Sequence, residues 1–311
     1  MRIGIDIMGG DYAPKETLDG AILALKELPK NTTIVLFGEK NQILSELKNR
    51  KISRQFEIID CPEFIAMDEH PIKALRLKPN SSIAKGFDYL QKGEINGFCS
   101  AGNTGAMFVG GFYTVKSIPG ILRPPLSTLI PREDGGVTVL LDVGANADCK
   151  PDVLYQFGIL GSLFSKYVCG IKNPKVSLLN LGEERNKGSM LTQSTYLLME
   201  NNPDFRFIGN CEGRDLFNSK SDVIVCDGFT GNVVLKEVEG IYTIMKKRGL
   251  LDDFFERFNY EDYGGTPILG LNKPVIIGHG ISNADAIKNM IILTKDVIDA
   301  DLTKKIKTSL D

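Results

Sequence analysis

Short apolar runs alternate along the chain with longer amphipathic segments, and most of the runs end in Gly, Asp or Asn. Runs such as Val-Thr-Val-Leu-Leu and Val-Ile-Val-Cys place apolar residues on both faces of a strand, which is typical of a parallel sheet covered by helices on each side. The pattern predicts strands at Arg2–Ile7, Thr33–Gly38, Phe56–Cys61, Gly97–Ala101, Leu126–Pro131, Val137–Asp142, Val176–Leu181, Phe205–Asn210, Val223–Asp227 and Val275–His279.

Helical spacing of apolar residues lies between these runs. It predicts helices at Lys15–Leu28, Thr104–Phe112, Pro151–Val168, Ser189–Asn201, Asn232–Arg248 and Ala284–Ile298, with a further charged helix after Thr33–Gly38. The alternation of strand, loop and helix predicts an α/β fold with a doubly wound, mostly parallel sheet, in which ligands bind at the carboxyl ends of the strands.

We expect residues 1–311 to form a single α/β catalytic unit, and keep two lobes with a shared cleft as the alternative. The Pro-rich break at Arg123-Pro124-Pro125 is the best candidate for a boundary or a crossover.

Composition narrows the function classes. The net charge of −2 argues against a nucleic-acid partner. No apolar run approaches the roughly 20 residues of a membrane span, and the first residues do not resemble an export signal, so we expect a cytoplasmic protein. The six cysteines are scattered without a CxxC pair and are interpreted as buried thiols in a reducing compartment. Two histidines exclude a histidine-rich metal site, and we expect no metal and no other cofactor.

Glycine accompanies Asp, Asn, Ser or Thr at one predicted strand end after another, for example in Ser100–Ala106 and in Asp227–Asn232. Glycine lets backbone N–H groups approach a ligand, and a helix start offers unpaired N–H donors to an anion. A single such segment is equally typical of a turn and a helix cap, but seven in one chain predict a cleft suited to phosphate. The chain contains neither GxxxxGK[ST] nor a strand-to-helix GxGxxG, which argues against a P-loop kinase and a standard dinucleotide-binding domain.

Eight segments carry a resemblance to a known family: DIMGGDYAP (6–14), SAGNTGA (100–106), LDVGANAD (141–148), LNLGEERNKG (179–188), FIGNCEGRD (207–215), DVIVCDGFTGNVVLKEVEG (222–240), YGGTPILG (263–270) and HGISNADAIKN (279–289). In this order they resemble the blocks of the PlsX family of bacterial phosphate acyltransferases, over nearly the whole chain. The resemblance implies a fold like that of isocitrate and isopropylmalate dehydrogenases and of phosphotransacetylase, usually as a homodimer.

The resemblance also implies a reaction in phospholipid biosynthesis, in which acyl-ACP (acyl carrier protein thioester) and inorganic phosphate give acyl-phosphate and the free carrier thiol. Phosphate is itself an oxygen nucleophile, so the enzyme has to hold the dianion beside the thioester and stabilise the developing oxyanion. Direct attack requires no cysteine or serine nucleophile.

Three residues are candidates for catalysis. Lys187 lies in a glycine-flanked loop and can contribute a cation to phosphate or to the oxyanion; the alternative is a solvated surface lysine. Asn232 follows Gly231 at a helix start and can donate to the reacting carbonyl or cap the helix. His279 lies between two glycines at a strand end and can protonate the leaving thiolate, orient phosphate, or bond a loop carbonyl.

The loop after Gly97–Ala101 is the candidate phosphate site, and Asn103 and Thr104 can contribute a side chain and an amide. We predict phosphate binding by Ser100, Asn103, Thr104 and Gly105. Carboxylates repel phosphate unless a cation intervenes, so the remaining polar residues at strand ends are predicted to orient loops, with a Mg²⁺ site as the less favoured alternative. These loop-orienting residues are Asp6, Asp11, Asp142, Asn146 and Asp227.

Residues 240–263 are predicted to form a short amphipathic helical segment, which is shorter than in the family members that the chain resembles. Its apolar face consists of Leu250, Leu251, Phe254, Phe255 and Phe258, and it follows the basic cluster Lys246-Lys247-Arg248. Packing within the protein, a contact with the dimer mate, a dock for the acidic carrier protein, and peripheral attachment to the inner face of the membrane all stay open for this segment.

Two alternatives to the acyltransferase come from other classes. An NAD-dependent β-decarboxylating dehydrogenase is suggested by fold analogy alone and would need an arginine cluster that the sequence does not supply. A non-enzymatic acyl-binding or scaffold protein would not need the many polar loops at strand ends.

Overall fold

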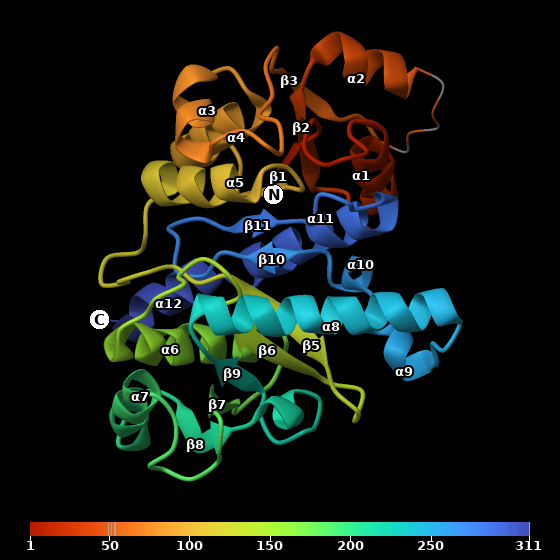
Figure 1. Cartoon of the computed structure of the whole chain (residues 1–311). Helices are drawn as coiled ribbons and strands as arrows, with labels where there is room; N and C mark the ends of the chain where they lie inside the picture. The colour runs from red at the N-terminus through yellow and green to blue at the C-terminus, as the bar shows by residue number, and fades with distance from the viewer. Residues whose placement is uncertain (49, 51, 53, 311) are drawn as a thin grey trace. The chain divides into compact units, whose positions relative to one another are not determined.

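The computed structural model describes residues 1–48, 50, 52 and 54–310, and the chain forms two compact units (Figure 1). Unit 1 consists of Met1–Lys116 and Tyr260–Asp299, and unit 2 of Ser117–Asn259 and Ala300–Asp311. The chain first passes from one unit to the other between Lys116 and Ser117, upstream of the Pro-rich break.

Unit 1 is built on a sheet with the strand order β10-β11-β4-β1-β2-β3. Its strands are β1 (Arg2–Asp6), β2 (Thr33–Gly38), β3 (Glu57–Asp60), β4 (Gly97–Ser100), β10 (Thr266–Pro267) and β11 (Val275–Ile277). All pairings are parallel except that of β10 with β11. Strands β2 and β3 extend the sheet on one side of β1 and β4 on the other, so the winding reverses between the carboxyl ends of β1 and β4. Ligands bind at such switch points in open α/β sheets.

The helices of unit 1 cover both faces of this sheet. They are α1 (Lys15–Glu27), α2 (Lys40–Leu47), α3 (Pro71–Leu77), α4 (Ser82–Lys92), α5 (Thr104–Gly110) with a π-helical turn over Gly111–Val115, α10 (Tyr260–Tyr263) and α11 (Ala284–Asp299). Helices α1 and α11 pack on each other, and α4 packs on β1, β2 and β4. The apolar residues of β1, β2, β4 and β11 are buried between these layers, as the consecutive apolar pattern requires, whereas those of β3 at the sheet edge are only half-buried.

Unit 2 contains the second sheet, with the order β5-β6-β9-β7-β8. Its strands are β5 (Ser127–Pro131), β6 (Val137–Leu141), β7 (Lys175–Leu179), β8 (Arg206–Cys211) and β9 (Val223–Val225). Only the pairing of β5 with β6 is antiparallel. The carboxyl ends of β6, β7, β8 and β9 therefore meet at one edge of the sheet.

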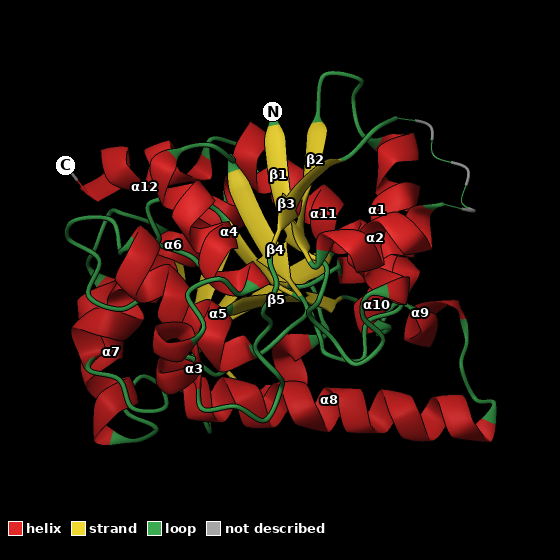
Figure 2. Ribbon diagram, turned by 90° about the horizontal axis from the view of Figure 1, so that it is seen from above, coloured by secondary structure: helices red, strands yellow, loops and turns green. Residues whose placement is uncertain are grey.

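The helices of unit 2 are α6 (Pro151–Tyr167), α7 (Met190–Glu200), α8 (Gly228–Arg248), α9 (Asp253–Glu256) and α12 (Leu302–Leu310), with a 3₁₀ turn over Gly213–Leu216. Helix α6 packs on the sheet, and α7 and α12 pack on α6. Helix α8 is the long helix in Figure 2, and only three of its 21 residues are buried. The helix begins at Gly228, four residues before the predicted first residue Asn232, because Asp227 is the N-cap and its side chain accepts the Thr230 N–H.

The prediction of an α/β fold with mostly parallel strands is confirmed, and every predicted strand is present with ends shifted by a few residues at most. The strands divide between two sheets, and α3, α4 and α12 were not predicted. In the region 240–263, predicted as a short amphipathic helical segment, the end of α8 is followed by the short helices α9 and α10. Gly249, with φ of +64°, ends α8 in the left-handed conformation typical of a helix C-terminus.

Candidate functional site

In unit 1, a buried carboxylate organises the loops at the switch point. Asp6 is the last residue of β1, and its carboxylate accepts hydrogen bonds from the Ser100 hydroxyl at 2.7 Å and the Met8 N–H at 3.0 Å. Burial raises the pKa of Asp6, and hydrogen bonds from Ser82, Ser100 and the following loop oppose the rise. The Ser100 hydroxyl in turn accepts the Gly102 N–H at 2.9 Å. Both side chains are therefore engaged in holding loops.

The His279 loop meets the other two loops of unit 1 through backbone hydrogen bonds. The Gly278 N–H donates to the Ser100 carbonyl at 2.8 Å, and the Asp11 N–H donates to the Gly280 carbonyl at 2.7 Å. His279 is half-buried, and its carbonyl accepts the Ser282 N–H at 3.0 Å. Asp11 thus joins two loops through its backbone, while its side chain is exposed.

Asn103, predicted to bind phosphate, uses its whole side chain inside the protein. Its Oδ1 accepts the Ala106 N–H at 2.9 Å and caps α5. Its Nδ2 lies 3.0, 3.1 and 3.0 Å from the carbonyls of Ala66, Met67 and Glu69. An amide has two N–H donors, so these three carbonyls already saturate it. In the predicted phosphate loop, Thr104 is exposed and Gly105 lies against Pro71.

In unit 2, Asp142 directly follows β6 and is fully buried. Its carboxylate accepts five hydrogen bonds, from the N–H groups of Leu126, Gly144, Ala145 and Asn146 and from the Asn146 side chain, at 2.6 to 3.2 Å. Asn146 also donates to the Pro124 carbonyl at 3.0 Å. The loop that follows β6 is therefore closed around one carboxylate.

The start of α8 is fastened to this loop. The Gly228 N–H donates to the Asn146 carbonyl at 2.8 Å, and a Cβ atom on Gly231 would overlap the Asp142 carbonyl. Asp227 caps the helix. One of its carboxylate oxygens accepts the Thr230 N–H at 2.8 Å, and the other accepts the Thr230 hydroxyl at 2.9 Å. Asn232 is exposed in the first turn, and its side chain lies beside Gly144. The predicted catalytic amide thus has a firmly positioned backbone.

Lys187 lies in the loop between β7 and α7, and its side chain is exposed. Its N–H donates to the Glu184 carbonyl at 3.1 Å and its carbonyl accepts the Asn180 side-chain amide at 3.0 Å. Gly188 has φ of +96°, and a Cβ atom there would overlap Asn180 and Thr192, so the turn after Lys187 requires glycine. The protein fixes the backbone of Lys187 and leaves its ammonium group in solvent.

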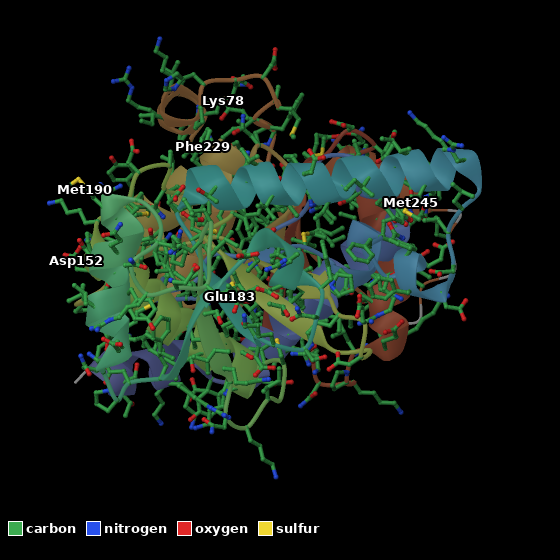
Figure 3. All side chains as sticks on the ribbon, turned by 60° about the horizontal axis from the view of Figure 1, so that its bottom comes forward. Lys78, Asp152, Glu183, Met190, Phe229 and Met245 are labelled. Carbon is green, nitrogen blue, oxygen red and sulfur yellow. The ribbon has the colours of Figure 1, made fainter. Side chains whose placement is uncertain are left out.

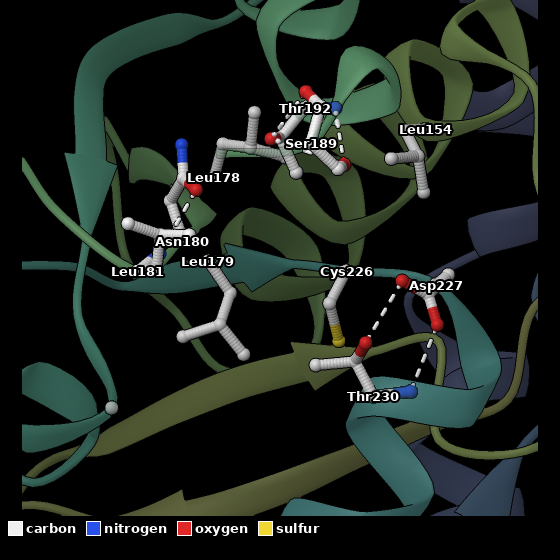
Figure 4. A pocket seen from close by; sticks show the side chains of 11 residues that line it. Leu154, Leu178, Leu179, Asn180, Leu181, Ser189, Thr192, Cys226, Asp227 and Thr230 are labelled. Carbon is white, nitrogen blue, oxygen red and sulfur yellow. Dashed lines mark hydrogen bonds between the residues drawn. The ribbon is translucent and has the colours of Figure 1, made fainter. Parts of the chain in front are cut away.

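A cavity of about 400 Å³ lies at the carboxyl ends of β7 and β9 in unit 2 (Figure 4). Residues from α6, β7, the start of α7 and the start of α8 line it together with Gly213: Leu154, Leu178, Leu179, Asn180, Leu181, Ser189, Thr192, Gly213, Cys226, Asp227 and Thr230. Asn180 and Thr230 were not singled out from the sequence. Asn180 directly follows β7, and Thr230 lies shortly after β9. Their position after a strand is the sequence signal that could have identified them.

The predicted site residues thus fall into two groups. Unit 1 holds Asp6, Asp11, Ser100, Asn103, Thr104, Gly105 and His279. Unit 2 holds Asp142, Asn146, Lys187, Asp227 and Asn232. Of these, Asp227 lines the cavity, Lys187 is hydrogen-bonded to the lining residue Asn180, and Asn232 lies in the first turn of α8, which begins at the cavity.

The cysteine thiols are poor nucleophiles in this fold. Burial raises the pKa of Cys61, Cys99, Cys149, Cys169 and Cys211 to about 12. Cys226 lines the cavity, and burial raises the pKa of its thiol well above its usual value. At neutral pH these thiols are protonated, whereas nucleophilic attack needs the thiolate.

The arrangement of side chains and the character of the helices bear on metal binding and on membrane insertion. Across residues 1–48, 50, 52 and 54–310, no three His, Cys, Asp or Glu side chains are grouped so that they could hold a metal ion. Within the same residues, no helix has the length and apolar character needed to span a bilayer.

Comparison with known proteins identifies relatives over the full chain. Residues 1–305 match the family described as "Fatty acid synthesis protein". The chain is 42% identical over 330 positions to a phosphate acyltransferase of Dictyoglomus thermophilum, covering all of this chain and 98% of that protein. It is 42% identical over 332 positions to a phosphate acyltransferase of Halothermothrix orenii, covering all of this chain and 99% of that protein.

Solved structures agree on the fold. A phosphotransacetylase from Streptococcus pyogenes superimposes with a TM-score of 0.68 at 18% identity, covering 96% of this chain and 94% of that one. A branched-chain phosphotransacylase from Enterococcus faecalis superimposes with a TM-score of 0.64 at 13% identity, covering 96% of this chain and 99% of that one. At these identities the structures establish the fold alone. The full-length sequence match confirms the resemblance noted from the motifs: the chain belongs to the fatty acid synthesis protein family, together with the phosphate acyltransferases.

Proposed function

We propose that this protein is a phosphate acyltransferase of phospholipid biosynthesis, which forms acyl-phosphate from acyl-ACP and inorganic phosphate. The observation that carries this proposal is the match of the entire chain, at about 42% identity, to relatives named phosphate acyltransferase. Neither the dehydrogenase nor the scaffold alternative is favoured by any of these relatives.

The reaction we propose is direct attack. A phosphate oxygen forms a bond to the thioester carbonyl carbon, the carbon–sulfur bond breaks, and the carrier thiolate leaves and takes up a proton. Lys187 neutralises charge on phosphate or on the developing oxyanion, Asn232 donates to the reacting carbonyl, and His279 supplies the proton to the thiolate. The exposed ammonium group of Lys187 and the raised pKa values of the buried thiols support attack by phosphate over attack by cysteine.

The phosphate itself is proposed to bind through the loop that begins at Ser100. Because the side chains of Ser100 and Asn103 are engaged within unit 1, Thr104 and the backbone of Gly105 are the groups left to contribute. The acidic residues Asp6, Asp142 and Asp227 act as loop organisers, which their hydrogen bonds to backbone N–H groups support.

The test is a turnover assay with purified protein, acyl-ACP and phosphate, without added nucleotide. Acyl-phosphate and free carrier thiol should appear in equal amounts and only when phosphate is present. Release of carrier thiol at the same rate without phosphate would refute the acyltransferase and point to a hydrolase.

We also propose that the protein is a cytoplasmic homodimer that pairs through α8. Phe229, near the start of the helix (Figure 3), is 68% exposed. Val233, Ile241 and Ile244 are exposed further along the same helix. An apolar stripe on one helix is unusual for a free surface and typical of an interface. Sedimentation should give a dimer for the native chain and a monomer for the double variant Ile241→Lys/Ile244→Lys. Peripheral membrane attachment by the same stripe is the competing proposal, and co-sedimentation with anionic vesicles tests it.

The carrier protein is proposed to dock beside the basic cluster Lys246-Lys247-Arg248 at the end of α8. The apolar residues that follow pack largely within unit 2: the rings of Phe254, Phe255 and Phe258 contact one another, and Phe258 contacts Phe217. Leu250 stays exposed beside the cluster. This leaves the charges as the main support for carrier docking at this place.

A further inference from the structure

The cavity of unit 2 has mainly hydrocarbon walls. Leu154 comes from α6, Leu178 and Leu179 from the end of β7, and Cys226 from the residue after β9. The three leucines and Cys226 are otherwise buried among neighbouring side chains. Its volume of about 400 Å³ falls within the roughly 300–1,000 Å³ of typical small-molecule pockets, which are mostly apolar.

The polar groups around the cavity already have partners. Asp227 is engaged with Thr230, Ser189 accepts the Thr192 N–H at 3.2 Å, and Asn180 donates to the Lys187 carbonyl. The described residues that line the cavity include no Lys, Arg or His, and Asp227 is their only charged group. A carboxylate without a cation opposes an anion, so the cavity does not suit phosphate. The amides of a pantetheine arm would find few free polar partners there, whereas a neutral hydrocarbon needs none.

The cavity also lies next to the residues proposed to act on the thioester. Asn180, on its wall, holds the backbone of Lys187, and Asp227, also on its wall, begins the helix that carries Asn232. A thioester carbonyl held by Lys187 and Asn232 would therefore have an apolar space close to it. Its acyl chain is the one part of the substrate that such a space can bind well.

We propose that this cavity receives the acyl chain of the thioester, and that Leu154 and Gly213 set the chain length that the enzyme prefers. The inference rests on the proposed function for the identity of the substrate. Each methylene that enters an apolar pocket strengthens binding by about fourfold, which corresponds to ~0.8 kcal/mol per buried CH₂. Chain-length preference is therefore the property that reports on the cavity.

Two variants change the cavity in opposite directions. Gly213 is an exposed residue of the cavity lining, and a Cβ atom there would meet no atom within 4 Å, so Gly213→Leu adds a side chain at the rim of the cavity without disturbing the backbone. Leu154→Ala enlarges the space. Its matched control is Leu160→Ala on the same helix, because Leu154 and Leu160 are 1% and 0% exposed and Leu160 does not line the cavity. Both alanine variants lose a buried leucine and should be destabilised alike.

The experiment measures kcat/KM with acyl-ACP substrates that carry short, medium and long saturated chains. Gly213→Leu should lower kcat/KM for the longest chain at least tenfold relative to the shortest. Leu154→Ala should shift the preference towards longer chains, and Leu160→Ala should leave the ratio as in the native enzyme. Equal ratios in all four proteins, with turnover intact, would overturn the inference and leave the proposed function standing.

A binding measurement keeps the two proposals separate. Acyl-pantetheine of graded chain length is titrated into each protein calorimetrically, without phosphate. The gain in affinity per methylene should be largest in the native protein and should shrink in Gly213→Leu. If no acyl-phosphate forms but this dependence is found, the proposed function fails and the cavity assignment holds. If affinity is independent of chain length in the native protein, the cavity assignment fails.

Discussion

Asn103 provides a sharp test, because a role in phosphate binding and a role in holding the fold predict different results. In the structure its side chain is 5% exposed, caps α5 and holds the three carbonyls of Ala66, Met67 and Glu69. We therefore expect its replacement to cost stability first. The folded protein should keep its affinity for phosphate, and any apparent loss should reflect the smaller folded fraction.

The magnitude follows from the bonds that each variant removes. Asn103→Ala loses the cap, worth ~1 kcal/mol, and the two N–H donors, worth ~0.5–1.5 kcal/mol each, so the free energy of unfolding should fall by about 2–4 kcal/mol. Asn103→Ser keeps a capping oxygen and loses only the donors, so it should be more stable than Asn103→Ala by about 1 kcal/mol. Thr104→Ala, at the exposed neighbouring position, should stay within about 0.5 kcal/mol of the native protein.

Urea denaturation measures these differences, and steady-state kinetics with varied phosphate is run on the same samples. The expected order of stability is native, Asn103→Ser, Asn103→Ala, with the KM for phosphate unchanged within about twofold. If Asn103→Ala is as stable as the native protein and its KM for phosphate rises more than tenfold, Asn103 is a phosphate ligand and not a residue that holds the fold.

Three further predictions concern the reaction. Lys187→Ala should lower kcat about 10²-fold at an unchanged denaturation midpoint, since its side chain is exposed; near-normal turnover would contradict its role. Thiol reagents should label the native protein slowly at pH 8 and about tenfold faster per pH unit towards the pKa of about 12, because only the thiolate reacts, and no acyl-cysteine should be trapped during turnover. Charge reversal at Lys246 and Lys247 should raise KM for acyl-ACP and weaken its salt dependence, while a small acyl thioester is unaffected; equal losses for both would indicate structural damage.

Most of the strands could be predicted from the sequence because β1, β2, β4, β6, β7 and β9 are buried at consecutive positions. A run such as Val223–Val225 is fully buried, so hydrophobicity alone marks it. The division into two sheets could not be predicted from hydrophobicity, because it depends on which strands pair. Pairing involves residues that lie far apart in the chain. The apolar pattern is the same for a strand in either sheet.

Helix α4 was missed although its ends carry recognisable signals. Ser81 caps it at the Ala84 N–H, and Gly93, with φ of +76°, ends it in the left-handed conformation. A Ser and a Gly at this spacing around an amphipathic stretch are sufficient to predict a helix. The partners of Asn103 were beyond reach of local reasoning, because Ala66 and Met67 are brought to it only by the packing of α3 and α5.

The sequence predicts a cleft in which backbone N–H groups at strand ends bind phosphate, but the carboxylates at these strand ends already occupy many of those N–H groups. Asp6, Asp142 and Asp227 each accept N–H groups of the loop or helix turn that follows them. A backbone N–H has one hydrogen to donate, so these groups are not available to phosphate. In the proposed reaction, the negative charge of phosphate therefore has to be balanced mainly by side-chain cations and by N–H groups outside these turns. Lys187, whose backbone is fixed and whose ammonium group is exposed, meets that requirement, and this is why its removal should affect turnover more than stability.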